Sequence, residues 1–439
     1  MTSLKKISVG ILTEKEIEFE FFGNFFYDNN LIFSGIQKVV FQKEKIFFEN
    51  NFYKEINFTP ENDNCFFELK NVTIGKEFHW KQKENQRFMG SLKFIVEDEK
   101  ITAVNIISAE DYLKSVISSE MNASSSLELL KAHAVISRSW LLANEKLRIK
   151  NEKSNRCVCS SGNSSFIKWY ERDAHRNFDV CADDHCQRYQ GILRQSNERV
   201  NQAVMQTCGV VLMYDGEICD TRFSKSCGGK TELFKNCWAD MHLPYLESVV
   251  DAPQENGVGE RADLTNEKNA EKWILSSPEC FCNTHDANIL AQVLNNYDRA
   301  TTDFFRWEKE FSQKEISETI CKKSGFDFGE ILDLIPMRRG ESGRIVELQI
   351  VGTKQIMTVG KELEIRKWLS ETHLYSSAFV VEKFDFKENI PQKFVLRGAG
   401  WGHGVGLCQI GAAVMGERGY KFDEILMHYF KNTELKKIY

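Results

Sequence analysis

The first hundred residues alternate apolar and polar side chains in short runs, a pattern typical of strands with one buried face. Asn- and Asp-rich stretches at 28–30 and 61–64 separate these runs and indicate turns. The pattern predicts a small β-rich N-terminal domain over 1–100, in which Cys65 and His79 are expected to be structural. The strand-like runs lie at 6–12, 16–22, 46–52 and 88–96.

The periodicity becomes helical after a further β-like run at 101–107. Ser108 to Asp111 has the form of a capping box that opens a helix, and Ser125 to Glu128 has the form of a second one. The second helix is expected to reach about Lys146. Its apolar residues fall on two faces, which indicates that it is substantially buried.

The rest of the chain mixes helices and strands, so the predicted fold class is α+β. The predicted elements are a helix end and strand over 202–214, a returning strand over 217–223, mostly helix from 266 to 323, a hairpin over 343–351 and 355–359, and a final helix over 423–429.

Composition is ordinary for a globular protein, with 42% hydrophobic and 27% charged residues among 439. The net charge of −6 makes the chain an unpromising nucleic-acid binder. Its 13 cysteines are odd in number and cannot all pair within one chain. Because they cluster near histidines in a chain long enough to bury its own core, metal ligands or reduced thiols are favoured over a disulfide framework.

Neither a secretory signal nor a membrane span is predicted. The segment Met1–Gly10 has two lysines but no apolar run after them. The segment Gly398–Gly416 lacks charged side chains, but its glycines, His403 and Gln409 favour a packed loop and a short helix over a membrane-spanning helix.

Four potential metal ligands fall within 12 residues, at His175, Cys181, His185 and Cys186. Cysteine and histidine at this spacing suit a tetrahedral zinc ion, and four protein ligands imply a closed, structural site. The alternatives are coincidence or two disulfides, and an upstream cysteine (Cys157 or Cys159) could replace one ligand. A weaker set, Cys280 and Cys282 with His285, lacks a fourth ligand.

Glu120 is the first candidate for catalysis. It lies between the two predicted helices, flanked by Ser119 and Met121. Burial there would raise the pKa of its carboxyl group and make it a general acid near neutral pH. The alternative is a solvated glutamate at a helix end.

Two glycine-rich segments are candidates for binding. In 223–232, Gly228 and Gly229 follow Cys227 and favour a loop that approaches a ligand, because no local histidine supports a nucleophilic cysteine. In 397–411, glycine alternates with Trp401 and His403. This string is neither a phosphate-binding loop nor a dinucleotide fingerprint, and it suits a sugar-binding groove or, alternatively, a tight β-corner around a core tryptophan.

Together these segments resemble the SpoIID/LytB family, which includes the sporulation protein SpoIID and the amidase modifier LytB. The resemblance covers about 101 to the C-terminus and leaves 1–100 outside it. It implies one SpoIID-type mixed domain over 101–439, with a helix-rich insertion around 254–328. The matching segments, in the family's order, are 113–121, 127–140, 187–191, 203–232, 339–348 and 398–429.

The resemblance implies a peptidoglycan lytic transglycosylase whose catalytic acid is Glu120. It also implies zinc on the four-residue His/Cys set. Cys408 and Ile410 depart from the family pattern, where a serine and an aromatic residue are common. The residues expected to contact substrate are Ser119, Met121, Ser226, Gly228, Gly229, Trp401, His403 and Gln409.

A non-catalytic reading remains open, because LytB-type relatives are amidase enhancers. The expected partners are peptidoglycan glycan strands and, in the enhancer reading, a cell-wall amidase, with no nucleic acid. Such a substrate indicates the cell envelope or periplasm, whereas the missing secretory signal would suit a cytoplasmic protein.

Overall fold

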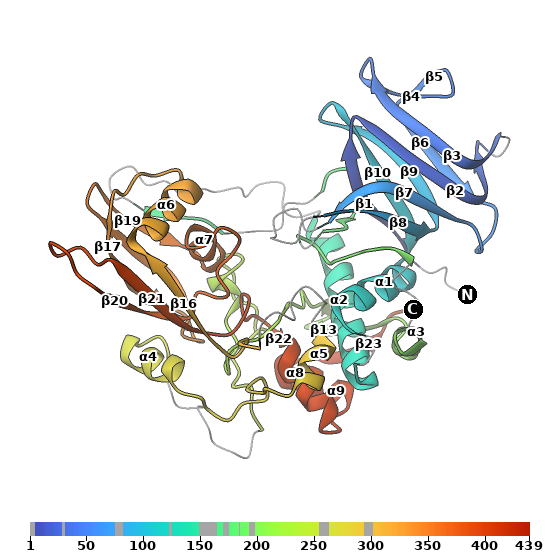
Figure 1. Cartoon of the computed structure of the whole chain (residues 1–439). Helices are drawn as coiled ribbons and strands as arrows, with labels where there is room; N and C mark the ends of the chain where they lie inside the picture. The colour runs from blue at the N-terminus through green and yellow to red at the C-terminus, as the bar shows by residue number, and fades with distance from the viewer. Residues whose placement is uncertain are drawn as a thin grey trace.

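The computed structural model of the chain describes residues 5–28, 31–74, 82–122, 125–148, 165–169, 175–183, 185–192, 198–253, 263–293 and 302–439, without the side chains of 144–148. His79, Cys157 and Cys159 lie outside these residues. Figure 1 shows three parts: an N-terminal sheet, a group of helices beneath it, and a second lobe beside both. The predicted mixture of helices and strands is confirmed.

The N-terminal part is one extended sheet of 11 strands. Its core is rich in phenylalanine: Phe58 is fully buried and packs its ring against those of Phe19 and Phe94. The sheet contains β1 (Lys6–Glu14), β2 (Glu16–Tyr27), β3 (Leu31–Gln42), β4 (Lys45–Phe48), β5 (Asn51–Tyr53), β6 (Glu55–Pro60), β7 (Phe66–Ile74), β8 (Gln82–Met89), β9 (Ser91–Glu97), β10 (Lys100–Ser108) and β12 (Val180–Cys181).

Two predicted strands are each divided by a turn. The run at 46–52 breaks at Glu49 and Asn50, which both have positive φ. The run at 88–96 breaks at Gly90, where a Cβ atom would lie 2.4 Å from the carbonyl oxygen of Ile106. The strand β10 continues the sheet to Ser108, past the expected boundary near residue 100, and pairs with both β1 and β9.

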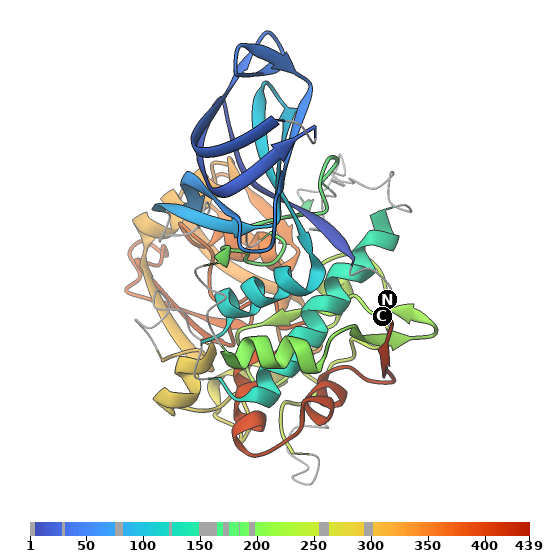
Figure 2. The same cartoon turned by 90° about the vertical axis from the view of Figure 1, so that its right-hand side faces the viewer.

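The helices lie beneath this sheet in both views (Figures 1 and 2). The first helix begins as predicted at Ser108, whose Oγ accepts the N–H of Asp111. The second prediction is wrong by one residue: Ser126 caps the helix by accepting the N–H of Leu129, and Ser125 instead donates to Gln292. This part contains α1 (Ala109–Glu120), α2 (Leu127–Arg148), α3 (Glu198–Gln206), α5 (Ala287–Val293), α8 (Gln409–Glu417), α9 (Phe422–Tyr429), and the sheet of β14 (Glu217–Ile218), β13 (Val210–Tyr214) and β23 (Glu434–Lys437).

The second lobe has its own hydrophobic core between two small sheets. Its strand β16 corrects the expectation of mostly helix over 266–323, because Trp307 and Phe311 are buried and their segment pairs with a distant strand. The lobe contains β11 (Ser165–Ile167), β19 (Ile356–Gly360), β18 (Ile345–Gly352) and β17 (Ile331–Arg339) in one sheet, β16 (Arg306–Ser312), β21 (Lys393–Ala399) and β20 (Phe379–Phe384) in the other, and α4 (Glu267–Leu275), α6 (Gln313–Ser324) and α7 (Glu362–Trp368).

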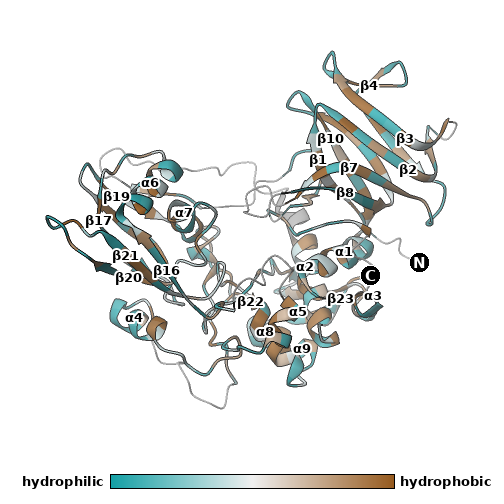
Figure 3. Cartoon of the chain, viewed as in Figure 1, coloured by the Kyte–Doolittle hydropathy of each residue, from teal (hydrophilic) through white to brown (hydrophobic). Residues whose placement is uncertain are grey.

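Two short strands join the helices to the second lobe. The strands β15 (Phe223–Ser224) and β22 (Leu407–Cys408) pair in parallel, so the two glycine-rich segments lie side by side. The predicted returning strand over 217–223 is therefore only partly formed, since its ends belong to β14 and β15. Figure 3 shows hydrophobic and hydrophilic residues alternating along the N-terminal strands. No helix within the described ranges is long and apolar enough to cross a membrane.

Candidate functional site

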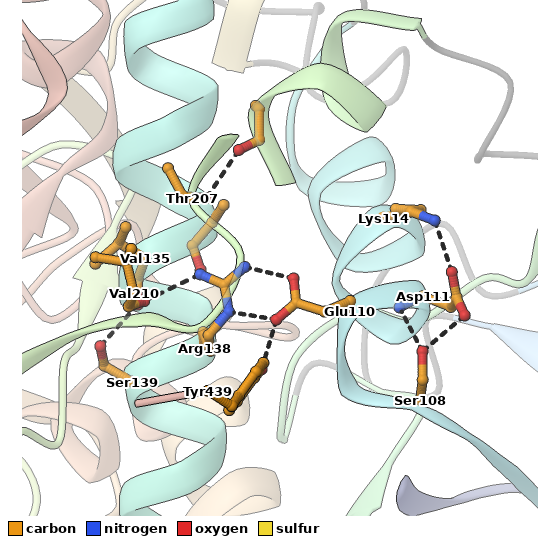
Figure 4. A network of polar contacts seen from close by, with 12 residues as sticks. Ser108, Glu110, Asp111, Lys114, Val135, Arg138, Ser139, Thr207, Val210 and Tyr439 are labelled. Carbon is orange, nitrogen blue, oxygen red and sulfur yellow. Dashed lines mark hydrogen bonds and ion pairs between the residues drawn. The ribbon is translucent and has the colours of Figure 1, made fainter. Parts of the chain in front are cut away.

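The end of α1 places Glu120 in a half-buried position. Its neighbours Ser119 and Met121 are each 2% exposed, so the carboxyl group adjoins the core. The helix is anchored at its other end by Glu110, which forms a bidentate ion pair with Arg138 of α2 (Figure 4). The two helices thus form a rigid frame for the carboxyl group of Glu120.

The segment 187–191 lies along α1 and reaches Glu120. The N–H of Arg188 donates to Oε1 of Glu120 at 3.4 Å. The ring of Tyr189 stacks on Tyr112 with the ring centroids 5.1 Å apart. The hydroxyl group of Ser115 donates to the carbonyl oxygen of Gly191 at 3.0 Å. The matching segment predicted at 187–191 is therefore part of the support of Glu120.

The four predicted zinc ligands come together immediately before this segment. One nitrogen or sulfur atom of each residue lies within 4.8 Å of those of the others. Cys186 Sγ lies 3.4 Å from His175 Nε2 and 3.5 Å from His185 Nδ1, which in turn lies 3.9 Å from Cys181 Sγ. A tetrahedral zinc ion would place such atoms about 3.3–3.8 Å apart, given metal–ligand distances of about 2.0–2.3 Å. The residues present therefore fit a closed zinc site.

The two glycine-rich segments are held together by their backbones. Ser226 and Trp401 form a β-bridge, with the N–H of each donating to the carbonyl oxygen of the other at 3.1 and 2.8 Å. A Cβ atom on Gly228 would lie 2.8 Å from the nitrogen of Gly400. Gly229 faces the side chains of Trp273 and Cys280, at 2.9 and 3.0 Å from its own Cβ position. Ser226, Gly228 and Gly229 are all buried, and their contacts with substrate stay predictions.

Alternating glycines in 398–406 bring the backbone close to the protein's own side chains. One of these is Arg344, which is fully buried. The sequence predicted that the backbone at these glycines approaches another group closely. In the structure that group is another part of the protein itself. A Cβ atom would lie 2.1 Å from the side chain of Trp307 at Gly398, 2.9 Å and 2.5 Å from that of Arg344 at Gly400 and Gly404, and 3.1 Å from that of Ser224 at Gly402. At Gly406 it would lie 2.2 Å from the backbone carbonyl oxygen of Arg222.

Arg344 is a buried residue of this site that the sequence motifs did not single out. Its guanidinium donates to the carbonyl oxygen of Gly402 at 3.1 and 3.2 Å and to that of Cys227 at 3.1 Å, so it joins both glycine-rich segments. It also donates to Ser342 Oγ, which donates to the buried carboxylate of Glu232 at 2.6 Å. The only signal in the sequence was that 339–348 belongs to the family's motifs.

The ring of Trp401 is partly covered by aromatic neighbours. Tyr375 stacks on it with the ring centroids 4.1 Å apart and an interplanar angle of 23°. Phe304 packs against it at 4.7 Å. Trp401 and Tyr375 are both half-buried, so the pair presents a partly exposed aromatic edge rather than a single free indole face.

His403 is held as a neutral imidazole. Its Nδ1 accepts the N–H of Val405 at 3.0 Å, which fixes the turn around it. Burial, followed by the nearby guanidinium groups of Arg222 and Arg344, lowers the pKa of His403 well below its usual value. A cationic or acid-donating role for this side chain at neutral pH is therefore disfavoured.

Gln409 is buried and bonded to a second histidine. Its Nε2 lies 3.3 Å from Nε2 of His133, whose Nδ1 lies 3.2 Å from the hydroxyl group of Ser137. Since an amide nitrogen only donates, His133 is neutral and carries its proton on Nδ1. Burial, with a smaller effect of Lys225, lowers the pKa of His133 to about 3. Gln409 thus ties α8 to α2, and its contact with substrate stays a prediction.

The short helix α5 connects the loop after Glu120 with the first glycine-rich segment. The N–H of Asn122 donates to the carbonyl oxygen of Gln292 at 2.8 Å. The ammonium group of Lys225 donates to that of Val293 at 2.5 Å. The Glu120 loop and the 223–232 loop are therefore both attached to the end of one helix.

The weaker cysteine set does not assemble as its spacing suggested. His285 is exposed, while Cys280 is buried and points its sulfur at the carbonyl oxygen of Gly229, 3.7 Å away. Cys282 lies beside Cys227 instead, with their sulfur atoms 3.6 Å apart.

Two family models match this chain. The one described as stage II sporulation protein matches residues 97–214, which contain α1, Glu120 and α2. The one described as a domain of unknown function (DUF8618) matches residues 232–406, which contain the second lobe except for β11.

Curated relatives point to the same family. The chain is 26% identical over 338 residues to the amidase enhancer of Bacillus subtilis, an alignment that spans 74% of this chain but only 40% of that relative. It is 26% identical over 348 residues to an uncharacterized protein of Brachyspira hyodysenteriae, covering 79% of this chain and 72% of the relative. It is 22% identical to stage II sporulation protein D of Bacillus amyloliquefaciens, covering 76% of each.

The fold and the site therefore define a mixed protein in which residues 97–214 match a stage II sporulation domain. The resemblance to the SpoIID/LytB family that the motifs predicted is confirmed by this match and by the relatives named amidase enhancer and stage II sporulation protein D.

Proposed function

We propose that the protein is a peptidoglycan lytic transglycosylase and that Glu120 is its catalytic acid and base. The observation that carries this proposal is the half-buried carboxyl group at the end of α1, next to buried Ser119 and Met121 and within hydrogen-bonding distance of the N–H of Arg188. A carboxyl group next to the core and fixed by a backbone donor is suited to proton transfer to a bound substrate.

One carboxyl group is sufficient for this reaction. The proton of Glu120 passes to the glycosidic oxygen between N-acetylmuramic acid and N-acetylglucosamine, and the bond from that oxygen to C1 breaks. The 6-hydroxyl oxygen of the muramic acid attacks C1, and its proton returns to the carboxylate of Glu120. The product is a 1,6-anhydro sugar, no water is consumed, and the intramolecular nucleophile benefits from proximity.

The binding surface of the proposed enzyme is formed around Trp401. The partly exposed Trp401–Tyr375 pair supplies an apolar edge for a sugar ring. Replacing Trp401 with alanine is expected to weaken retention of the protein on insoluble peptidoglycan, and unchanged retention would remove this residue from the binding surface.

The histidine and cysteine set at 175–186 is proposed to hold a structural zinc ion. His175, Cys181, His185 and Cys186 would supply all four ligands and leave no position for substrate or water. Bound zinc would fix the loop that leads into Arg188, whose N–H bonds Glu120. The metal would therefore act on catalysis only through the position of this segment.

The test is digestion of purified peptidoglycan by the full chain and by Glu120→Gln, with the products identified by mass spectrometry. Anhydro-muramic products are expected from the parent protein and are expected to fall at least ~100-fold in the variant, since general acid catalysis contributes about that factor or more. Glu271→Gln, which alters an exposed glutamate on α4, serves as the control. Products from Glu120→Gln at the parent rate would refute the assignment.

Two observations favour a second function, that of a non-catalytic amidase enhancer. One relative carries that name, and the side chains of His403 and Gln409 form hydrogen bonds within the protein. In this reading the protein binds the wall and stimulates a cell-wall amidase without cutting glycan strands. A purified amidase added to the same digestion separates the two functions. Stimulation that Glu120→Gln preserves, together with no anhydro products from the parent protein, would establish the enhancer.

A further inference from the structure

Four buried side chains with metal-binding atoms lie close together near the start of α8. They come from segments far apart in the sequence: Cys227, Asp251, Cys282 and Cys408. Their exposed fractions are 2%, 0%, 1% and 0%. One sulfur or carboxylate oxygen from each lies within 4.8 Å of those of the others. Neither glycine-rich motif nor the spacing of the cysteines predicted this group.

The spacing of the atoms fits a tetrahedral metal ion. The sulfur atoms of Cys227 and Cys282 are 3.6 Å apart. Zinc with thiolates at about 2.3 Å and a carboxylate oxygen at about 2.0 Å would place two sulfurs about 3.8 Å apart and a sulfur and an oxygen about 3.5 Å apart. Three thiolates and one carboxylate favour a thiophilic divalent ion such as zinc over magnesium or calcium.

The ligands are oriented by a surrounding layer of hydrogen bonds. Oδ1 of Asp251 accepts the hydroxyl group of Tyr429 at 2.6 Å, and Oδ2 accepts the N–H of Cys282 at 3.0 Å. The sulfur of Cys408 accepts the N–H of Cys227 at 3.3 Å. Such contacts fix ligand orientation at metal sites.

Space for the carboxylate depends on a glycine in α8. A Cβ atom on Gly411 would lie 2.5 and 2.6 Å from the two oxygens of Asp251. The guanidinium group of Arg306 donates to the carbonyl oxygen of Gly228 at 3.0 Å, next in sequence to Cys227. It brings a positive charge toward a set that would carry a net charge of about −2 with zinc bound.

We infer that Cys227, Asp251, Cys282 and Cys408 form a second, closed zinc site, distinct from the His/Cys set on the N-terminal sheet. With four protein ligands it is structural. It joins the two glycine-rich segments, through Cys227 and Cys408, to two other segments of the chain, through Asp251 and Cys282. The metal would thus hold in place the two segments that carry the proposed binding surface.

The test measures zinc in the full chain and in a variant without the first site. Cys181→Ser combined with Cys186→Ser removes two ligands of the His/Cys set. Elemental analysis is expected to find two zinc ions per chain in the parent protein and one in this double variant. Adding Cys282→Ser is expected to remove the remaining ion, whereas Cys280→Ser, at a buried cysteine outside the set, is expected to retain it.

Cobalt substitution reports which ligands are used. In the double variant only the second site remains. Its cobalt form is expected to show a thiolate-to-cobalt charge-transfer band with the intensity of three thiolate ligands, and Cys282→Ser is expected to abolish this band. If Cys282→Ser does not fold, Asp251→Asn in the same background is expected to release the metal to a chelator at least ~10-fold faster. A folded double variant without zinc, or a Cys227–Cys282 disulfide found after thiol blocking, would overturn the proposal.

Discussion

Glu110 and Arg138 form a bidentate ion pair that is almost completely removed from solvent. Nε and Nη2 of Arg138 lie 2.7 and 2.6 Å from the two carboxylate oxygens of Glu110. The side chain of Arg138 is 0% exposed and that of Glu110 is 8% exposed. The hydroxyl group of Tyr439 donates to the same carboxylate at 2.5 Å. As Figure 4 shows, the pair links α1 to α2, and so it fixes the helix that ends at Glu120.

Breaking this pair is expected to destabilise the protein strongly. Glu110→Gln leaves the guanidinium group of Arg138 buried without its counter-ion, which costs about 3–5 kcal/mol. The free energy of unfolding from denaturant titration measures the loss. Glu318→Gln is the matched control, because its ion pair with Lys314 is 68% and 82% exposed and contributes less than about 1 kcal/mol. Equal losses in the two variants would contradict the role given to the buried pair.

Gly404→Ala is expected to displace Arg344. Both Gly404 and Gly216 have a φ of 76°, so alanine at either position carries the same backbone strain of about 1–2 kcal/mol. Only at Gly404 would the new Cβ atom lie 2.5 Å from Arg344, while Gly216 has open space. The difference in unfolding free energy between the two variants is expected to be about 1–3 kcal/mol. Indistinguishable variants would show that Arg344 can move without cost.

Stability is expected to fall as the pH is lowered toward 4, in part because of His133. The pKa of this buried imidazole is lowered to about 3, so between about pH 3 and its usual 6.5 the unfolded chain binds a proton that the folded chain does not. The unfolding free energy therefore rises with pH across this window, by up to about 1.4 kcal/mol per pH unit for one group.

Denaturant titrations between pH 4 and 7 measure this slope. His133→Gln is expected to reduce it, since the titrating group is gone. Gln409→Leu is the control: it removes the neighbour at 3.3 Å but keeps the imidazole, so the slope should remain. A slope that is the same with and without His133 would assign the pH dependence to other groups.

Loss of the first metal site is expected to reduce activity without removing the catalytic carboxyl group. Cys181→Ser is expected to release zinc from the His/Cys set and to loosen the segment in which Arg188 donates to Glu120. The rate of anhydro-product formation is expected to fall about 10–100-fold, the range found when support of a functional site is lost. Hydrogen exchange at 186–191 should increase in parallel. Full activity in zinc-free Cys181→Ser would separate the metal from Glu120.

Local patterns in the sequence predicted most individual elements correctly. Alternation predicted β1 and β2, and the Ser108 cap predicted the start of α1, because both depend on residues near one another in the chain. The helical expectation around Trp307 was wrong because β16 is stabilised by β21, about 90 residues further along. Pairing with a distant strand leaves little trace in a local pattern.

The sequence by itself determined the resemblance to the SpoIID/LytB family, the position of Glu120 at a helix end and the His/Cys set, since each depends on closely spaced residues. Only the tertiary structure decided which side chains pack against the glycines of 398–406 and which cysteines lie close enough to share a metal ion. Arg344 packs against Gly400 and Gly404, and Cys282 lies with Cys227 and Cys408 rather than forming a metal site with Cys280 and His285. These contacts join segments up to 181 residues apart. Packing across such separations is set by the folded core as a whole, which no local spacing records.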